Sequence, residues 1–199
     1  MHRTSFYIVN AITVYRLIAA FFLLYLIVIG YAELFKWLLL ISFFTDAIDG
    51  FLARRFGVVT EVGSRLDSIA DDLTVLMGIV GMTVFETGFV WDQLPLIFAL
   101  VGLYFLQLLM AFIRYGRPTS FHTYIAKFAT LLQGLFLILL FILPAWPVTL
   151  FHVAAFFTAM DLLEEIVLVM MLPTWQHDIK GLYWVLKRKK QHHAIAGKP

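Results

Sequence analysis

The sequence contains no cysteine and few charged residues. Without cysteine, no disulfide and no thiol chemistry is available to the chain. Charged residues make up 14% of the 199 positions, whereas ordinary soluble domains carry about 25%. The formal net charge is only +2, so the composition gives no basic footprint for nucleic acid. Hydrophobic residues reach 62%, and a water-soluble fold of this size has too little interior to hide them, which predicts an integral membrane protein.

Apolar residues are concentrated in six stretches, each long enough to cross a hydrocarbon core of about 30 Å. They cover residues 6–29, 34–52, 66–85, 94–113, 124–143 and 148–172. Backbone polar groups must be paired internally in lipid, so these stretches are predicted to be helices of an all-α membrane fold. We expect a six-helix catalytic domain at 1–172 and a basic cytoplasmic tail at 173–199. That tail is either an amphipathic helix on the membrane surface or an ordinary charged end.

Charge alternates from one connection to the next. Basic residues follow the second and fourth stretches and fill the tail, whereas the other connections are acidic or uncharged. The basic positions are Arg54, Arg55, Arg65, Arg114, Arg117 and the run from Lys187 to Lys190. The positive-inside rule then predicts that both termini are cytoplasmic. The expected location is the inner membrane of a bacterium.

Four aspartates flank the connection between the second and third stretches. Asp46 and Asp49 are three residues apart, and Asp67 and Asp71 are four apart, so each pair shares one helix face. The two helices would be antiparallel, which brings the carboxylates to one level in a polar cavity open to the cytoplasm. Such a cluster needs neutralisation, and hard oxygen donors suit two Mg²⁺ or Mn²⁺ ions. A diphosphate bridged by the metals and helped by Arg54 would make this a phosphoryl-transfer site.

Three other interpretations of these acids remain open. An ion-coupled transporter would use them as an ion path, but it would be expected to show inverted repeats, and the sequence shows none. A prenyltransferase-like enzyme also binds diphosphate through aspartates and metal, although that class usually has a longer chain. A non-catalytic scaffold with a relic motif is the third interpretation.

The stretch 46–71 resembles the signature of the CDP-alcohol phosphotransferase family, D-x-x-D-G-x-x-A-R-x8-G-x3-D-x3-D. All eight defining positions are filled, by Asp46, Asp49, Gly50, Ala53, Arg54, Gly63, Asp67 and Asp71. Residues 10–16 also resemble the family's N-x-[IL]-T-x-x-R element. Lys127, Thr130 and Gln133 resemble a further G-K-x-K-T-x-x-Q element, in which Ala126 and Ala129 replace the glycine and the second lysine.

The resemblance implies a reaction and roles for the motif residues. A CDP-linked lipid such as CDP-diacylglycerol would donate its phosphatidyl group to the hydroxyl of a small polar alcohol, with release of CMP. Asp46, Asp49 and Asp67 would be metal ligands, and Asp71 would both ligate a metal and act as general base. The CDP-lipid would be bound by Asn10, Thr13, Gly50, Ala53, Arg54 and Gly63, the last opening a bend before the third helix. Members of the family often form homodimers.

The sequence leaves the acceptor alcohol open. Arg114, Arg117 and Lys127 would bind the phosphate of a polyol phosphate, or they only satisfy the positive-inside rule. Ser68 and Asp72 replace residues typical of glycerol-phosphate-using members. Serine-using and inositol-using groups have no positive signature here.

Three acids lie in the sixth apolar stretch, at Asp161, Glu164 and Glu165. Charged groups within a membrane helix need partners and mark function. We expect them, Glu164 above all, to line the cavity and contact acceptor hydroxyls. The alternative is that they pair with Arg16 or Lys127.

Overall fold

A computed structural model describes residues 2–56, 61–119, 121, 123–176 and 179–187. Within the helices, the side chains of residues 2–13, 46–47, 49–56, 61–68 and 72 are outside this description. Every regular element in the described ranges is a helix, which confirms the predicted all-α class.

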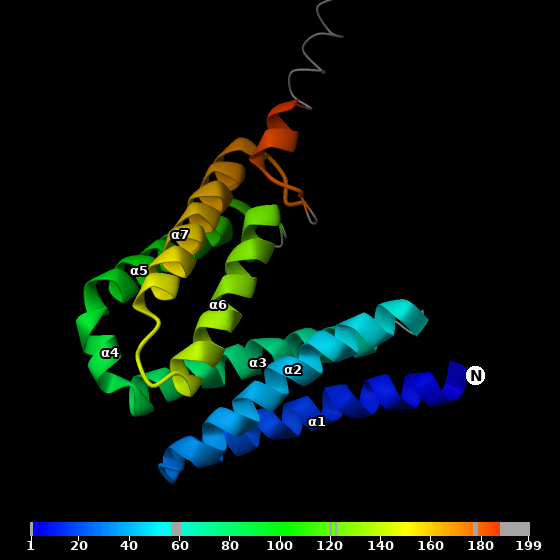
Figure 1. The fold of residues 1–199 in the computed structure, drawn as a ribbon. Helices are drawn as coiled ribbons and strands as arrows, with labels where there is room; N and C mark the ends of the chain where they lie inside the picture. Colours follow the sequence, from blue (N-terminus) through cyan, green and yellow to red (C-terminus); the bar gives the residue numbers. More distant parts are fainter. Residues whose placement is uncertain (1, 57–60, 120, 122, 177–178, 188–199) are drawn as a thin grey trace, which may run out of the picture. The chain divides into compact units, whose positions relative to one another are not determined.

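Six long helices and one short one follow each other along the chain (Figure 1). They are α1 (His2–Val28), α2 (Ala32–Phe56), α3 (Glu61–Phe85), α4 (Thr87–Asp92), α5 (Leu94–Tyr115), α6 (Tyr124–Ile142) and α7 (Val148–Met171). Residues 182–187 add a last helical segment. Each of the six long helices covers most or all of one of the six apolar stretches, whereas α4 was not predicted in the connection after residue 85.

Two of the described helices, α5 and α6, are long and apolar enough to cross a membrane, and Val14–Val28 forms a shorter apolar helix. Many large apolar side chains on these helices are exposed, such as Ile113 with 78% of its surface accessible. Apolar surface of this extent needs an apolar surrounding. The number of spans and the side of each terminus stay predictions.

The chain forms two compact units. The first unit contains Met1–Asp92 and Leu137–Trp146, and the second contains Gln93–Phe136 and Pro147–Pro199. The first unit therefore holds α1 to α4 and the end of α6, while the second holds α5, most of α6 and α7. Each unit has its own buried core and is described by itself.

The core of the first unit lies where α1, α2 and α3 pack side by side (Figure 1). Leu26 of α1, Phe35 and Leu39 of α2 and Met77 of α3 are buried together there. The Phe35 ring also lies 5.1 Å from the ring of Phe141. The contact between α2 and α3 brings together the two helices that carry the four aspartates.

The core of the second unit joins α5 and α7 to the segment that follows α7. Ala111 of α5 and Leu168 of α7 are buried together with Ile179 and Val185. Ile179 and Val185 of the tail therefore pack on their own unit, whereas Tyr183 and Leu186 stay exposed. The start of α6 is capped in the same region, because the Ala126 N–H donates to Thr123 Oγ1 at 3.1 Å.

Candidate active site

The aspartate motif lies on two neighbouring helices of the first unit. α2 runs unbroken to Phe56, so Asp46 and Asp49 lie on one continuous helix, as the sequence predicted. Asp67 and Asp71 lie on α3. The side chains of the first three aspartates are outside the described ones, so the convergence of the four carboxylates stays a prediction.

Asp71 is the one motif aspartate whose side chain is described, and it is paired with Arg16 of α1. Arg16 Nη2 donates to Asp71 Oδ1. The arginine is only 1% exposed, whereas 39% of the Asp71 side chain is accessible. A charge inside a membrane helix needs a partner of opposite sign. This ion pair therefore fastens α1 to α3 at the last aspartate of the motif.

The sequence also offered Arg16 as an alternative partner for the acids of the sixth stretch, and its described ion pair is with Asp71. In the sequence, the feature that points to this ion pair is the N-x-[IL]-T-x-x-R element, which ends at Arg16. A buried arginine in a helix beside an aspartate motif has the motif as its nearest source of negative charge.

The described geometry of Asp71 suits a divalent cation. Oδ1 accepts from Arg16, and a carboxylate has further acceptor sites on its second oxygen. The side chain is 39% exposed, so part of Asp71 is accessible to a ligand. The described side chains contain no group of three or more acids, histidines or cysteines that would hold a metal, and three of the four predicted ligands are outside them. An all-carboxylate donor set is the type that Mg²⁺ and Mn²⁺ prefer.

The residues predicted to bind the CDP-lipid all lie on helices of the first unit, and their side chains are outside the described ones. They are Asn10, Thr13, Gly50, Ala53, Arg54 and Gly63. One detail of the prediction is wrong. α3 begins at Glu61, so Gly63 lies inside its first turn and does not open a bend before it. An acidic residue is favourable at a helix N-terminus, which accounts for the earlier start.

The basic residues proposed for the acceptor lie in the second unit, where two of them contact the chain after α7. Arg114 Nη2 donates to the Leu172 carbonyl at 3.4 Å. The Arg117 guanidinium lies 3.9 Å from the centre of the Trp175 ring. Lys127 is exposed, with Nζ 5.8 Å from the Tyr124 ring. Phosphate binding by these residues stays a prediction.

Glu165 of α7 is held by two polar side chains that the sequence analysis did not single out. Its Oε2 accepts from Gln107 Nε2 at 2.6 Å and from Thr119 Oγ1 at 2.7 Å. Gln107 is buried in α5 and also donates to Thr119 Oγ1 at 2.8 Å. The carboxylate therefore links α7, α5 and the loop after α5. In the sequence, the position of Gln107 in the middle of an apolar stretch was the feature that could have indicated a buried polar partner for one of the acids.

Asp161 and Glu164 are also bonded within the second unit. Asp161 Oδ1 accepts from the buried Thr123 hydroxyl at 3.3 Å. Glu164 Oε1 accepts from the Leu182 N–H at 2.7 Å, which satisfies one of the free donors at the start of the last helical segment. These partners differ from the ion pairs with Arg16 or Lys127 that were considered. The contact with acceptor hydroxyls stays a prediction.

Comparison with known proteins places these residues in a family. The family model described as CDP-alcohol phosphatidyltransferase matches residues 6–177 of the chain. A fusion protein of Schizosaccharomyces pombe, described as cardiolipin synthase (CMP-forming) / mitochondrial hydrolase, is 30% identical over 87 residues. That match covers 44% of this chain and 15% of the fusion protein. No solved structure matches the chain. The matched range contains the complete aspartate motif and most of both units, and the chain belongs to the CDP-alcohol phosphatidyltransferase family.

Proposed function

We propose that this protein transfers a phosphatidyl group from a CDP-linked lipid, such as CDP-diacylglycerol, to the hydroxyl of a small polar alcohol and releases CMP. The observation that carries the proposal is the aspartate motif, filled at every position and located on two packed helices of one unit. Membership in the family supports the reaction class. The relative described as CMP-forming supports CMP as the leaving group. Its name also adds one candidate acceptor, a lipid whose reaction would produce cardiolipin.

The reaction forms a bond between the acceptor oxygen and the phosphorus of the lipid phosphate, and it breaks the bond from that phosphorus to CMP. Two divalent cations, Mg²⁺ or Mn²⁺, held by Asp46, Asp49, Asp67 and Asp71 would neutralise the diphosphate and the leaving CMP. Asp71 takes the proton of the attacking hydroxyl as general base. Arg16 donates to Oδ1 of that carboxylate and would hold its orientation toward the attacking hydroxyl.

The proposal includes the membrane setting. The family and the apolar α5 and α6 indicate an integral membrane protein. By the positive-inside rule, the basic connections support a cytoplasmic position for the aspartates. The bacterial inner membrane and a homodimer are further predictions that follow from the sequence analysis.

The test is release of labelled CMP from CDP-diacylglycerol by the purified full chain in lipid–detergent micelles. The acceptors to compare are glycerol 3-phosphate, inositol, inositol phosphate, serine and phosphatidylglycerol. We expect CMP release with one of these acceptors, loss of release in EDTA, and recovery on addition of Mg²⁺ or Mn²⁺. Absence of acceptor-dependent CMP release with every acceptor and both metals would refute the proposed reaction.

A matched pair of variants tests the role of Asp71. Asp71→Asn should lower turnover by at least a hundredfold, within the range of a lost general base, while CDP-lipid binding survives. Asp92→Asn makes the same chemical change at an exposed position at the end of α4 and should leave turnover unchanged. A wild-type rate in Asp71→Asn would remove Asp71 from the role of base.

A further inference from the structure

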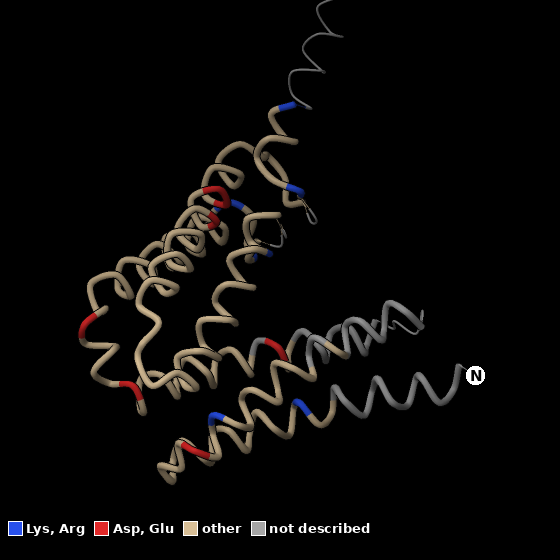
Figure 2. Tube along the Cα trace, viewed as in Figure 1, with Lys and Arg blue, Asp and Glu red and all other residues tan. Residues whose placement is uncertain are grey.

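In the second unit the described cations are exposed, whereas the described acids are half-buried. All five of its described lysines and arginines are exposed, namely Arg114, Arg117, Lys127, Lys180 and Lys187. Its three described acids lie on α7, and each accepts a hydrogen bond from within the unit. No ion pair joins a described cation of this unit to one of these carboxylates. Figure 2 shows the basic positions of the unit near its C-terminal segment.

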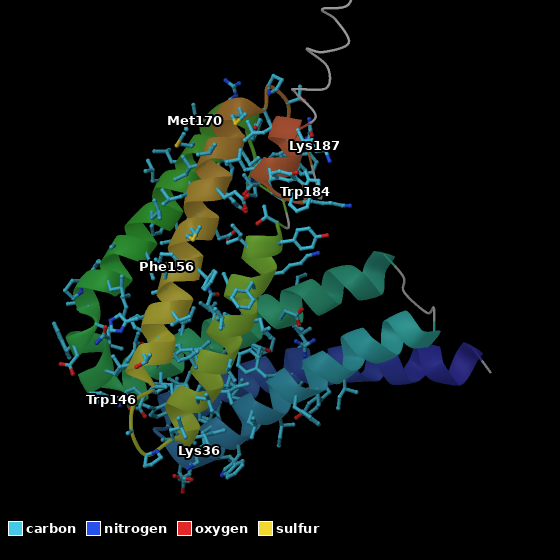
Figure 3. All side chains as sticks on the ribbon, turned by 45° about the horizontal axis from the view of Figure 1, so that its top comes forward. Lys36, Trp146, Phe156, Met170, Trp184 and Lys187 are labelled. Carbon is cyan, nitrogen blue, oxygen red and sulfur yellow. The ribbon has the colours of Figure 1, made fainter. Side chains whose placement is uncertain are left out.

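Aromatic side chains lie beside two of the exposed cations, Trp175 next to Arg117 and Tyr124 next to Lys127. The Tyr124 ring lies 5.8 Å from Lys127 Nζ and 5.3 Å from the Trp184 ring. Tyr183 packs edge-on against Trp184 at 5.4 Å and is itself 65% exposed. Figure 3 shows Trp184 and Lys187 projecting from the same short segment. We call this set the basic–aromatic surface: Arg117, Tyr124, Lys127, Lys180, Trp184 and Lys187.

We propose that the basic–aromatic surface binds the headgroups of anionic phospholipids of the membrane that holds the chain. Tyrosine and tryptophan favour the depth of the headgroups, because one end of each ring is apolar and the other can form hydrogen bonds. Exposed lysines and arginines at that depth attract anionic lipid phosphates. The sequence continues from Lys187 with Arg188, Lys189 and Lys190, which adds charge of the same sign.

A comparison within the chain favours a lipid over other anions. On the first unit, the exposed Glu33 pairs with Lys36 at 2.7 Å, so that lysine has its own counter-charge. The cations of the basic–aromatic surface have no such partner among the described residues. They also lie beside exposed apolar side chains, such as Leu186 next to Lys187. A nucleic acid would leave these apolar groups in water, whereas a bilayer covers them. The proposal does not depend on the reaction proposed above.

The experiment measures lipid binding by native mass spectrometry of the full chain in detergent, titrated with phosphatidylglycerol, phosphatidylserine or phosphatidylcholine. The test variant is Lys180→Gln with Lys187→Gln, since neither lysine belongs to the proposed reaction site. We expect wild-type protein to bind both anionic lipids more tightly than phosphatidylcholine. The double variant should lose about fivefold in affinity for each lysine, or about 25-fold for anionic lipids, and nothing for phosphatidylcholine. Lys36→Gln is the control, with wild-type binding expected.

Three outcomes would overturn the proposal. The first is equal binding of phosphatidylcholine and the anionic lipids by wild-type protein. The second is an unchanged affinity in the double variant, with folding checked by thermal melting. The third is complete displacement of the lipids by millimolar glycerol 3-phosphate, which would make the surface a site for a soluble phosphate. Phosphatidylglycerol and phosphatidylserine carry different headgroup alcohols. Equal affinity for both would show that the surface recognises the anionic phosphate and not a particular acceptor alcohol.

Discussion

The ion pair between Arg16 and Asp71 should stabilise the first unit measurably. Arg16→Met keeps an apolar side chain of similar length in the core and removes the guanidinium. Breaking a buried pair costs about 3–5 kcal/mol. Because 39% of the Asp71 side chain is accessible, water solvates part of the carboxylate that is left behind. The value expected for a charge-assisted hydrogen bond, about 2 kcal/mol, is therefore the better guide to the loss.

A double-mutant cycle isolates the pair from the other contacts of Arg16. The cycle compares Arg16→Met, Asp71→Asn and the double variant by equilibrium unfolding in mixed micelles, followed by circular dichroism. We expect a coupling free energy of about 1–2 kcal/mol. The control cycle uses Lys36→Met and Glu33→Gln, whose pair is exposed and three residues apart. Its coupling should stay below about 0.5 kcal/mol.

Arg16→Lys adds a test of geometry. Lysine keeps the charge but lacks the planar fork of the guanidinium, so it should recover only part of the lost stability. If the proposed reaction is correct, Arg16→Met should also lower kcat more than it weakens CDP-lipid binding, because the carboxylate of Asp71 loses its fixed orientation. A coupling energy no larger than that of the control cycle would refute this account of how α1 is held to α3.

Two further predictions test packing in the first unit and the anchoring of the tail. Gly81→Ala should destabilise the protein by about 1–3 kcal/mol, since the added methyl group would overlap the buried ring of Phe35. Gly102→Ala, at an open helix position, should be neutral or stabilising in the same thermal melt, and equal losses in both variants would contradict the packing argument. Glu164→Gln should raise the acceptor KM more than it changes CDP-lipid binding. Unchanged kinetics with faster proteolysis after Leu182 would assign Glu164 only to holding the tail.

Helix positions were accessible from the sequence because length and apolar composition set them. The predicted stretches 94–113 and 124–143 differ from α5 and α6 by one or two residues at their ends. The continuation of α2 through Asp46 and Asp49 was predicted by the same reasoning. α4 was missed because its six residues, TGFVWD, lie in a connection and are too few to show a period.

The partners of the buried polar groups were harder to predict, because they depend on how each helix is rotated about its axis. Glu165 bonds to Gln107, which is 58 residues away, and Arg16 bonds to Asp71, which is 55 residues away. Apolar faces surround most of these helices, so periodicity does not say which face meets which neighbour. Sequence reasoning therefore found the acids and the arginine but not their pairings.

The scarcity of charge in this sequence gives each buried polar group a large effect on structure. Lipid tails are as apolar as leucine, so burial of apolar side chains does not decide which helices pair in a bilayer. Hydrogen bonds and ion pairs between helices do decide which helices become neighbours, because only some pairs of helices can form them. Arg16 selects α3 as a neighbour of α1 in the first unit, and Glu165 selects α5 as a neighbour of α7 in the second. Asp71 is paired with Arg16 and is also the proposed general base, so if the proposed reaction is correct, substitution there should lower both stability and turnover.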